Sequence, residues 1–288
     1  MYRRFDSTNH VNHADPADVL QAGLRVSPGV QQAALLKPGL IVAGATGPLG
    51  SEVLRRLAGG GRFAHTHVLT SEPIGTGMAQ ISLLQSGSGP ISNWPDGPAA
   101  EVGVVMFEPP RLYYQRERAL WTPEPAQLLE LAQWFRRCGV DTLAIVVPHA
   151  QGRLPDALKQ GLANLDEQAV SALGFNRLLL VRAAHKPAPA PGKGLLDRAA
   201  ALVLSTMSYM LPATEQAVRP AKLAEFIEIA LHLLPRGIHV ASPELLWRAS
   251  QSKSMLAAGD GPLVTGESGM HDLVRAWLGS AAPVGDQR

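Results

Sequence analysis

Short apolar runs and amphipathic segments alternate along the chain from about residue 38 onward. The apolar runs are rich in Val, Ile and Leu and are bounded by glycine or proline, as buried strands of a parallel sheet are. They predict strands over 39–43, 67–70, 79–84, 102–107, 142–147, 177–183 and 238–241. We expect Pro148 to end the strand before it, because proline has no backbone N–H to donate.

Between these runs, apolar residues recur at the spacing of one helix face. They predict helices over 51–58, 125–138, 155–173, 195–210, 220–234, 242–250 and 270–278. The repeated order of helix, glycine and strand is typical of parallel βαβ units. The sequence therefore predicts an α/β fold, a doubly wound parallel sheet with a small C-terminal α-rich region on the substrate side.

The stretch before the first predicted strand has a different character. Residues 1–37 mix Arg, Asp, Asn, His and Gln, and they show neither a sustained apolar face nor the apolar core of a secretory signal. We expect a flexible extension over 1–37, one domain over 38–250, and a tail with a short helix over 251–288. With no export signal, we expect the protein to be cytoplasmic.

Composition and charge narrow the function classes. Hydrophobic residues make up 46% of the 288 residues and charged residues 17%, which excludes a disordered chain. The net charge of +2 gives no support to nucleic-acid binding, and no apolar run is long enough to span a membrane. The single cysteine, Cys138, excludes a disulfide framework. His10 and His13 have no further ligand nearby, so we expect no metal site.

One motif carries specific chemistry. It is the run Gly44-Ala45-Thr46-Gly47-Pro48-Leu49-Gly50, directly after the first predicted strand and directly before an amphipathic helix. Gly44 permits a tight turn, Gly47 lets a pyrophosphate approach the backbone, and Gly50 permits close packing of the helix. The amides at the start of the helix then face the phosphates, and Pro48 is tolerated there. We expect all seven residues to bind a dinucleotide.

The segment GLIVAGATGPLGSEVLRRL resembles the start of an atypical short-chain dehydrogenase/reductase, a family of NAD(P)-binding proteins with a GxxGxxG loop. The likeness extends at the level of pattern from about Lys37 to Leu246. It implies a Rossmann fold over 38–250 and a nicotinamide dinucleotide as cofactor. The choice between NAD and NADP stays open, because Thr70, Ser71 and Glu72 at the end of the second strand do not decide it.

The catalytic pair of that family, Tyr-x-x-x-Lys, is missing from this sequence. Its four tyrosines are followed four positions later by Asp6, Glu117, Arg118 and Ala213. The family places the pair in the predicted helix over 155–173, but this helix contains no tyrosine. We expect Lys159 on the same helix to be exposed to solvent. The resemblance therefore implies a cofactor scaffold, and the family's activity does not carry over.

Two further sets of residues are candidates beside the loop. His149 follows a core strand at its carboxyl end, where open α/β sheets build their sites, and histidine exchanges protons near neutral pH. A contact between this histidine and the neighbouring backbone is the alternative. Arginines at 111, 116 and 118 with tyrosines at 113 and 114 follow another strand, either to bind phosphate or as a solvated basic loop.

Three functions remain open. The leading one is an NAD(P)-binding protein without the standard Tyr/Lys chemistry, acting as a cofactor sensor or scaffold for a small-molecule or protein partner. The second is an NAD(P)H-dependent oxidoreductase on a small carbonyl compound, with His149 or water managing the proton. The third is an interaction domain that no longer binds cofactor.

Overall fold

The computed structural model describes residues 37–75, 80–111, 114–150, 165–185, 218–251 and 268–280. From Pro38 onward they belong to one compact unit. Apart from Lys37, the extension predicted over 1–37 lies outside the described residues, as do the helix predicted over 195–210, Lys159 and Tyr113.

A seven-stranded sheet forms the centre of this unit, and all six neighbouring pairs of strands are parallel. The strands are β1 (Leu40–Ala43), β2 (Thr66–Thr70), β3 (Ile81–Gln85), β4 (Val102–Met106), β5 (Thr142–Ala150), β6 (Arg177–His185) and β7 (Gly237–Ala241). Their order across the sheet is β3-β2-β1-β4-β5-β6-β7. Six of these strands have the order of a Rossmann fold, and β7 extends it. The predicted fold class is confirmed.

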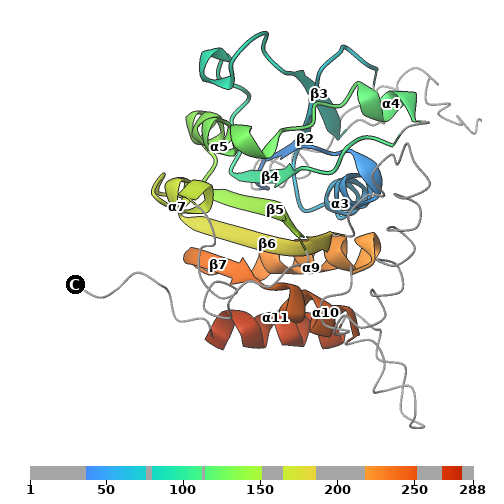
Figure 1. Cartoon of the computed structure of the whole chain (residues 1–288), viewed down its shortest axis with the longest axis vertical. Helices are drawn as coiled ribbons and strands as arrows, with labels where there is room; N and C mark the ends of the chain where they lie inside the picture. Colours follow the sequence, from blue (N-terminus) through green and yellow to red (C-terminus); the bar gives the residue numbers. More distant parts are fainter. Residues whose placement is uncertain are drawn as a thin grey trace, which may run out of the picture. The chain divides into compact units, whose positions relative to one another are not determined.

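Helices cover both faces of the sheet (Figure 1). The α-helices are α3 (Gly47–Gly59), α4 (Gln115–Arg118), α5 (Leu128–Arg137), α7 (Leu165–Ser171), α9 (Pro220–Leu233), α10 (Pro243–Gln251) and α11 (Ser268–Ser280). Single turns of 3-10 helix occur at Ile91–Asn93 and Pro125–Gln127.

Successive residues of the central strands point to opposite faces, and both faces are buried. Leu40 and Val42 belong to the buried cluster that residues of α3, α9, α10 and α11 also join, whereas Ile41 and Ala43 belong to the cluster on the α5 and α7 side. This burial on both sides is why the strands appear in the sequence as continuous apolar runs and not as alternating ones.

Strand β5 differs from the prediction at its end. It continues through Pro148 to Ala150 and pairs there with β6, so the expected stop at Pro148 is wrong. The physical reason is the shorter neighbour on the other side, because β4 ends at Met106, opposite Val146. Beyond that point β5 is an edge on one side, where a proline without an N–H is tolerated.

The C-terminal helices belong to the same core. Ser242 accepts the backbone N–H of Leu245 at 3.4 Å and so caps α10, which begins at Pro243. Helix α11 packs against α9 and α10, and buries Met270, Val274 and Leu278 in the cluster beneath α3 and α9. The substrate-side role of this region stays a prediction.

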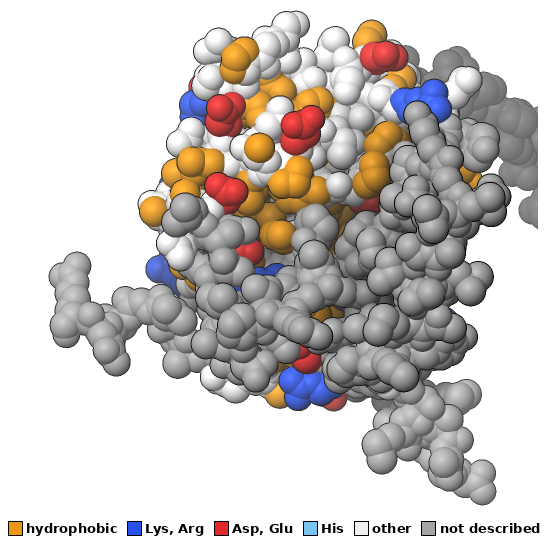
Figure 2. Space-filling model, in the orientation of Figure 1, with side chains coloured by type: hydrophobic (Ala, Val, Ile, Leu, Met, Phe, Trp, Pro, Cys, Tyr) orange, Lys and Arg blue, Asp and Glu red, His pale blue; other side chains and the backbone are white. Residues whose placement is uncertain are grey.

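Acidic, basic and apolar side chains are mixed over the described part of the face in Figure 2.

Candidate functional site

The glycine loop lies at the point where the strand order reverses. It joins the end of β1 to α3, and β1 stands between β2 and β4 at the centre of the sheet. In open α/β sheets, ligands bind at this position, outside the carboxyl ends of the strands. Helix α3 begins at Gly47, four residues earlier than predicted, so the second half of the loop is the first turn of the helix.

Two of the loop glycines have the steric roles that the sequence predicts. Gly44 has a φ of 76°, and a Cβ there would overlap the carbonyl oxygen of Met106. A Cβ at Gly50 would lie 2.6 Å from the carbonyl carbon of Ala45, so this glycine lets the helix pack against the loop. The backbone N–H of Gly44 donates to the carbonyl of Trp121 at 3.1 Å.

The third glycine faces a carboxylate of the protein itself. Gly47 has a φ of 69°, and a Cβ there would lie 2.5 Å from the Cδ atom of Glu108. The N–H of Leu49 donates to Oε2 of Glu108 at 2.6 Å, and the N–H of Gly47 donates to Oε2 of Glu117 at 3.2 Å. The amides that the motif predicts for a pyrophosphate therefore hold two carboxylates.

Glu117 is fixed in this arrangement by further bonds. It is buried, with 6% of its surface exposed, and accepts the backbone N–H of Arg111 at 3.0 Å and its Nε at 2.8 Å. The Ser51 hydroxyl donates to Oε1 of Glu117 at 3.3 Å. Burial alone raises the pKa of the Glu117 carboxyl, but the bonds from Arg111 and Gly47 outweigh it, so this pKa lies below its ordinary value.

Arg111 is positioned by the same contacts. Its guanidinium stacks on the ring of Tyr114, 3.8 Å from the ring centre, and forms an ion pair with Glu117. The hydrogen bond to Glu117 raises the pKa of Arg111, and the nearby charge of Glu108 adds to this effect. Of the predicted basic loop, Arg111 therefore faces the glycine loop, while Arg116 and Arg118 on α4 are exposed.

The chain between β4 and α5, drawn with α4 in green in Figure 1, runs over the carboxyl ends of β1 and β2. The N–H of Trp121 donates to the Leu69 carbonyl at 3.0 Å, and that of Ser71 donates to the Ala119 carbonyl at 2.8 Å. In dinucleotide-binding folds the adenosine ribose lies near the end of β2. Here residues 119–121 contact that strand end, and Glu72 beside them is exposed.

The donors of the loop fit a phosphate. Glu108 holds the Leu49 amide at the helix start, whereas Glu117 holds the Gly47 amide, the Ser51 hydroxyl and the Arg111 guanidinium. The hollow above Gly47 exists only because no Cβ fills it, and the Glu108 side chain stands there in place of an external anion. A phosphate group therefore fits the hollow and the Leu49 amide after the Glu108 carboxylate has moved.

Glu108 and Glu117 were not among the predicted site residues. Glu108 comes two residues after the end of β4, the strand beside β1, and this position was the available signal. His149, the other predicted candidate, lies on the extended end of β5, in register with Ala184. Its backbone is thus at the carboxyl edge of the sheet, and its role stays a prediction.

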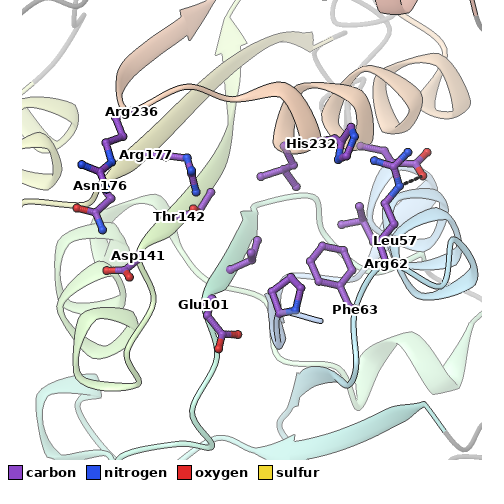
Figure 3. Close-up of a pocket in the computed structure, with 14 residues that line it drawn as sticks. Leu57, Arg62, Phe63, Glu101, Asp141, Thr142, Asn176, Arg177, His232 and Arg236 are labelled. Carbon is purple, nitrogen blue, oxygen red and sulfur yellow. Dashed lines mark ion pairs between the residues drawn. The ribbon is translucent and has the colours of Figure 1, made fainter. Parts of the chain in front are cut away.

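A pocket of about 520 Å³ lies at the opposite edge, by the amino ends of β4, β5 and β6 (Figure 3). Its acidic residues are already engaged: Glu228 pairs with Arg56 at 2.5 Å, and Glu101 accepts the Gly39 N–H at 2.5 Å. Arg62 also lines this pocket, so it lies away from the carboxyl end of β2.

No family model matches the chain, and no curated protein matches it. Similar solved structures include the UDP-N-acetylglucosamine 4-epimerase of Bacillus cereus, with 11% identity over 86% of this chain and 99% of that chain, at a TM-score of 0.41. The Bordetella bronchiseptica enzyme WbmG, in complex with NAD, is 12% identical over 80% of this chain and 81% of its own, at a TM-score of 0.38.

A third similar structure is the glucuronic acid dehydrogenase of Chromohalobacter salexigens, 12% identical over 71% of this chain and 76% of that chain, at a TM-score of 0.39. Likenesses this distant transfer no activity, so the fold assignment rests on the strand order and on the loop itself.

Two other kinds of feature are absent from the described residues. Within the described ranges, no helix has the length and apolarity to cross a membrane. The same part of the chain contains no cluster of three or more His, Cys, Asp or Glu placed to hold a metal ion.

Proposed function

We propose that this chain is an NAD(P)-binding protein of the atypical short-chain dehydrogenase/reductase type that lacks reductase chemistry and acts as a cofactor sensor or scaffold. The observation that carries the proposal is the pair of amides at Gly47 and Leu49, each of which holds a carboxylate. These donors stand at the strand-order reversal, where a Rossmann fold binds the pyrophosphate of a dinucleotide.

A bound nicotinamide dinucleotide supplies hydride transfer, and the residues of this chain supply its binding. The Leu49 N–H is the hydrogen-bond donor toward a phosphate oxygen once Glu108 has moved, and Glu117 keeps the Ser51 hydroxyl and Arg111 in place beside it. Hydride transfer to a carbonyl also requires a proton for the oxygen. None of the four tyrosines has a lysine four residues later, so the standard donor of this family is missing.

Two alternatives remain, each with one supporting observation. An oxidoreductase with a non-standard proton donor is supported by the backbone position of His149 at the carboxyl edge. An interaction domain that no longer binds cofactor is supported by the carboxylates on the loop and by residues 119–121 at the end of β2.

Cofactor binding is tested with two alanine substitutions at glycines of similar conformation. Gly47 and Gly61 have φ values of 69° and 62°, so alanine strains the backbone similarly at both. A Cβ at Gly61 meets no atom within 4 Å, whereas one at Gly47 fills the phosphate hollow. We expect Gly47→Ala to lose affinity for NADH and NADPH in calorimetric titration and Gly61→Ala to keep it. Equal affinities, in folded proteins, would remove the loop from the binding site.

The absence of reductase chemistry is tested by a screen of aldehydes, ketones and quinones with NADH and NADPH. Loss of a general acid typically lowers a rate by about 10²- to 10⁴-fold, so we expect turnover to be absent or very low. Robust turnover by the parent would support the oxidoreductase instead. In that case, loss of turnover in His149→Ala would assign the proton to His149, and unchanged turnover would exclude it.

A further inference from the structure

We propose that Glu108 is an internal competitor of the ligand, a side chain that occupies the phosphate hollow of the ligand-free chain and must leave before a dinucleotide binds. The proposal rests on the proposed function and adds a regulation of that same site. It follows from three observations: where the Glu108 carboxylate lies, how its main chain is held, and how it differs from Glu117.

The carboxylate of Glu108 lies where a phosphate is expected. Its Oε2 accepts the Leu49 N–H at 2.6 Å, and its Oε2 and Cγ are each 2.6 Å from the position of a Cβ on Gly47. A second anion within a few ångströms of this carboxylate would be repelled by its charge. Occupation of the hollow by Glu108 and by a pyrophosphate is therefore mutually exclusive.

The main chain of Glu108 is held while its side chain is not enclosed. The hydroxyl of Thr46 donates to the Glu108 carbonyl and also lies 3.0 Å from the hydroxyl of Thr122. The residue as a whole is only half-buried. Rotation of the Glu108 side chain therefore frees the Leu49 amide without moving the loop to which the main chain is attached.

Glu117 is more deeply buried than Glu108. Only 8% of its side-chain surface is exposed, and Arg111 balances its charge in an ion pair. It keeps the Gly47 amide when Glu108 leaves, and with Arg111 it adds no net charge. A ligand therefore competes with one carboxylate and not with two, and it must bring an anion that Leu49 binds better than a glutamate. Phosphate and pyrophosphate groups are ligands of this class.

An internal competitor raises the apparent Kd by the reciprocal of the fraction of molecules in the open state. A hydrogen bond to a charged group is worth a factor of about 10 to 100 in an equilibrium constant. We therefore expect Glu108→Ala and Glu108→Gln to bind NADH, NADPH and inorganic pyrophosphate about 10- to 100-fold more tightly than the parent. Glu130→Ala is the matched control, since Glu130 is an exposed glutamate on α5, outside the loop.

Amide hydrogen exchange in the ligand-free chain measures the hydrogen bond between the Leu49 N–H and Glu108 directly. We expect faster exchange at Leu49 in Glu108→Ala, and unchanged exchange at Gly47, whose N–H is held by Glu117. NMR of the full chain measures both amides. Tighter binding together with faster exchange at Leu49 supports the competitor.

The outcomes separate this inference from the proposed function. Measurable binding with the same Kd in the parent, Glu108→Ala and Glu130→Ala would overturn the competitor and leave the cofactor site standing. No binding of any of the three probes by any folded variant would overturn the cofactor site, and the competitor with it. Tighter binding in Glu130→Ala as well would assign the effect to net charge and overturn a specific role of Glu108.

Discussion

Alanine at Gly44 tests whether the turn after β1 needs glycine for its conformation alone or also for space. Gly44 and Gly61 both have positive φ, at 76° and 62°. They differ in their surroundings, because a Cβ at Gly61 meets nothing within 4 Å, whereas one at Gly44 overlaps the Met106 carbonyl. Gly61→Ala therefore measures the conformational cost, and Gly44→Ala measures that cost plus the steric overlap.

The two costs have different magnitudes. A left-handed conformation costs a residue with a Cβ about 1–2 kcal/mol, which is the expected effect of Gly61→Ala on the free energy of unfolding. Forcing an extra atom into a packed site adds about 1–3 kcal/mol. The obstacle at Gly44 is backbone at the end of β4, where Met106 pairs with Val146, so it moves only if the sheet does. The expected total for Gly44→Ala is about 2–5 kcal/mol.

Thermal unfolding followed by circular dichroism compares the two variants. In a chain of about this size, 1 kcal/mol shifts Tm by about 2–4 °C. The additional overlap at Gly44 should therefore lower Tm by about 2–12 °C beyond the value for Gly61→Ala. Equal melting temperatures for the two variants would refute the steric part of the reasoning and, with it, the close contact between the loop and β4.

Two further predictions concern buried charge. Glu167 and Arg182 form an ion pair at 2.7 Å with side chains 2% and 1% exposed, so Glu167→Gln should lower the free energy of unfolding by about 3–5 kcal/mol. A double variant, Glu167→Leu with Arg182→Met, should recover much of this loss in urea unfolding. Burial lowers the pKa of His239, so its contribution to stability is lost as the pH falls below about 6.5, the pKa of an unfolded histidine. His239→Leu should therefore reduce the loss of stability between about pH 8 and about pH 5.5, and an unchanged loss would exclude this histidine as a cause.

The sequence predicted those parts of the fold that depend on local pattern. The strand over 39–43 appears as β1 (Leu40–Ala43), and the helix over 220–234 appears as α9 (Pro220–Leu233), because their burial requires apolar residues at fixed spacing. The continuation of β5 beyond Pro148 was missed, because it depends on where the neighbouring strand ends. The local sequence pattern around Pro148 contains no information about the length of β4.

The two carboxylates at the glycine loop could not be predicted from local sequence pattern for a similar reason. Glu108 and Glu117 are 59 and 70 residues from the amides that they accept, and they come from a connection whose path no periodic pattern describes. The motif predicted the donors correctly as hydrogen-bond donors at a helix start. It contained no information about the carboxylates that the same chain supplies to them.

Glycine at position 47 is required by either occupant of the hollow. The Glu108 side chain lies within 2.6 Å of where a Cβ would stand, and a pyrophosphate would need the same space. A three-glycine loop between a strand and a helix is therefore compatible both with a cofactor site and with a turn closed by the protein's own carboxylate. What separates the two is whether the carboxylate gives way to a ligand. The amides at a helix start need a hydrogen-bond acceptor. In a chain that binds a dinucleotide, a displaceable carboxylate satisfies these amides while no ligand is bound. Glu108 is half-buried, whereas Glu117 is buried. This difference between the two carboxylates favours a displaceable acceptor at Leu49 and a permanent one at Gly47.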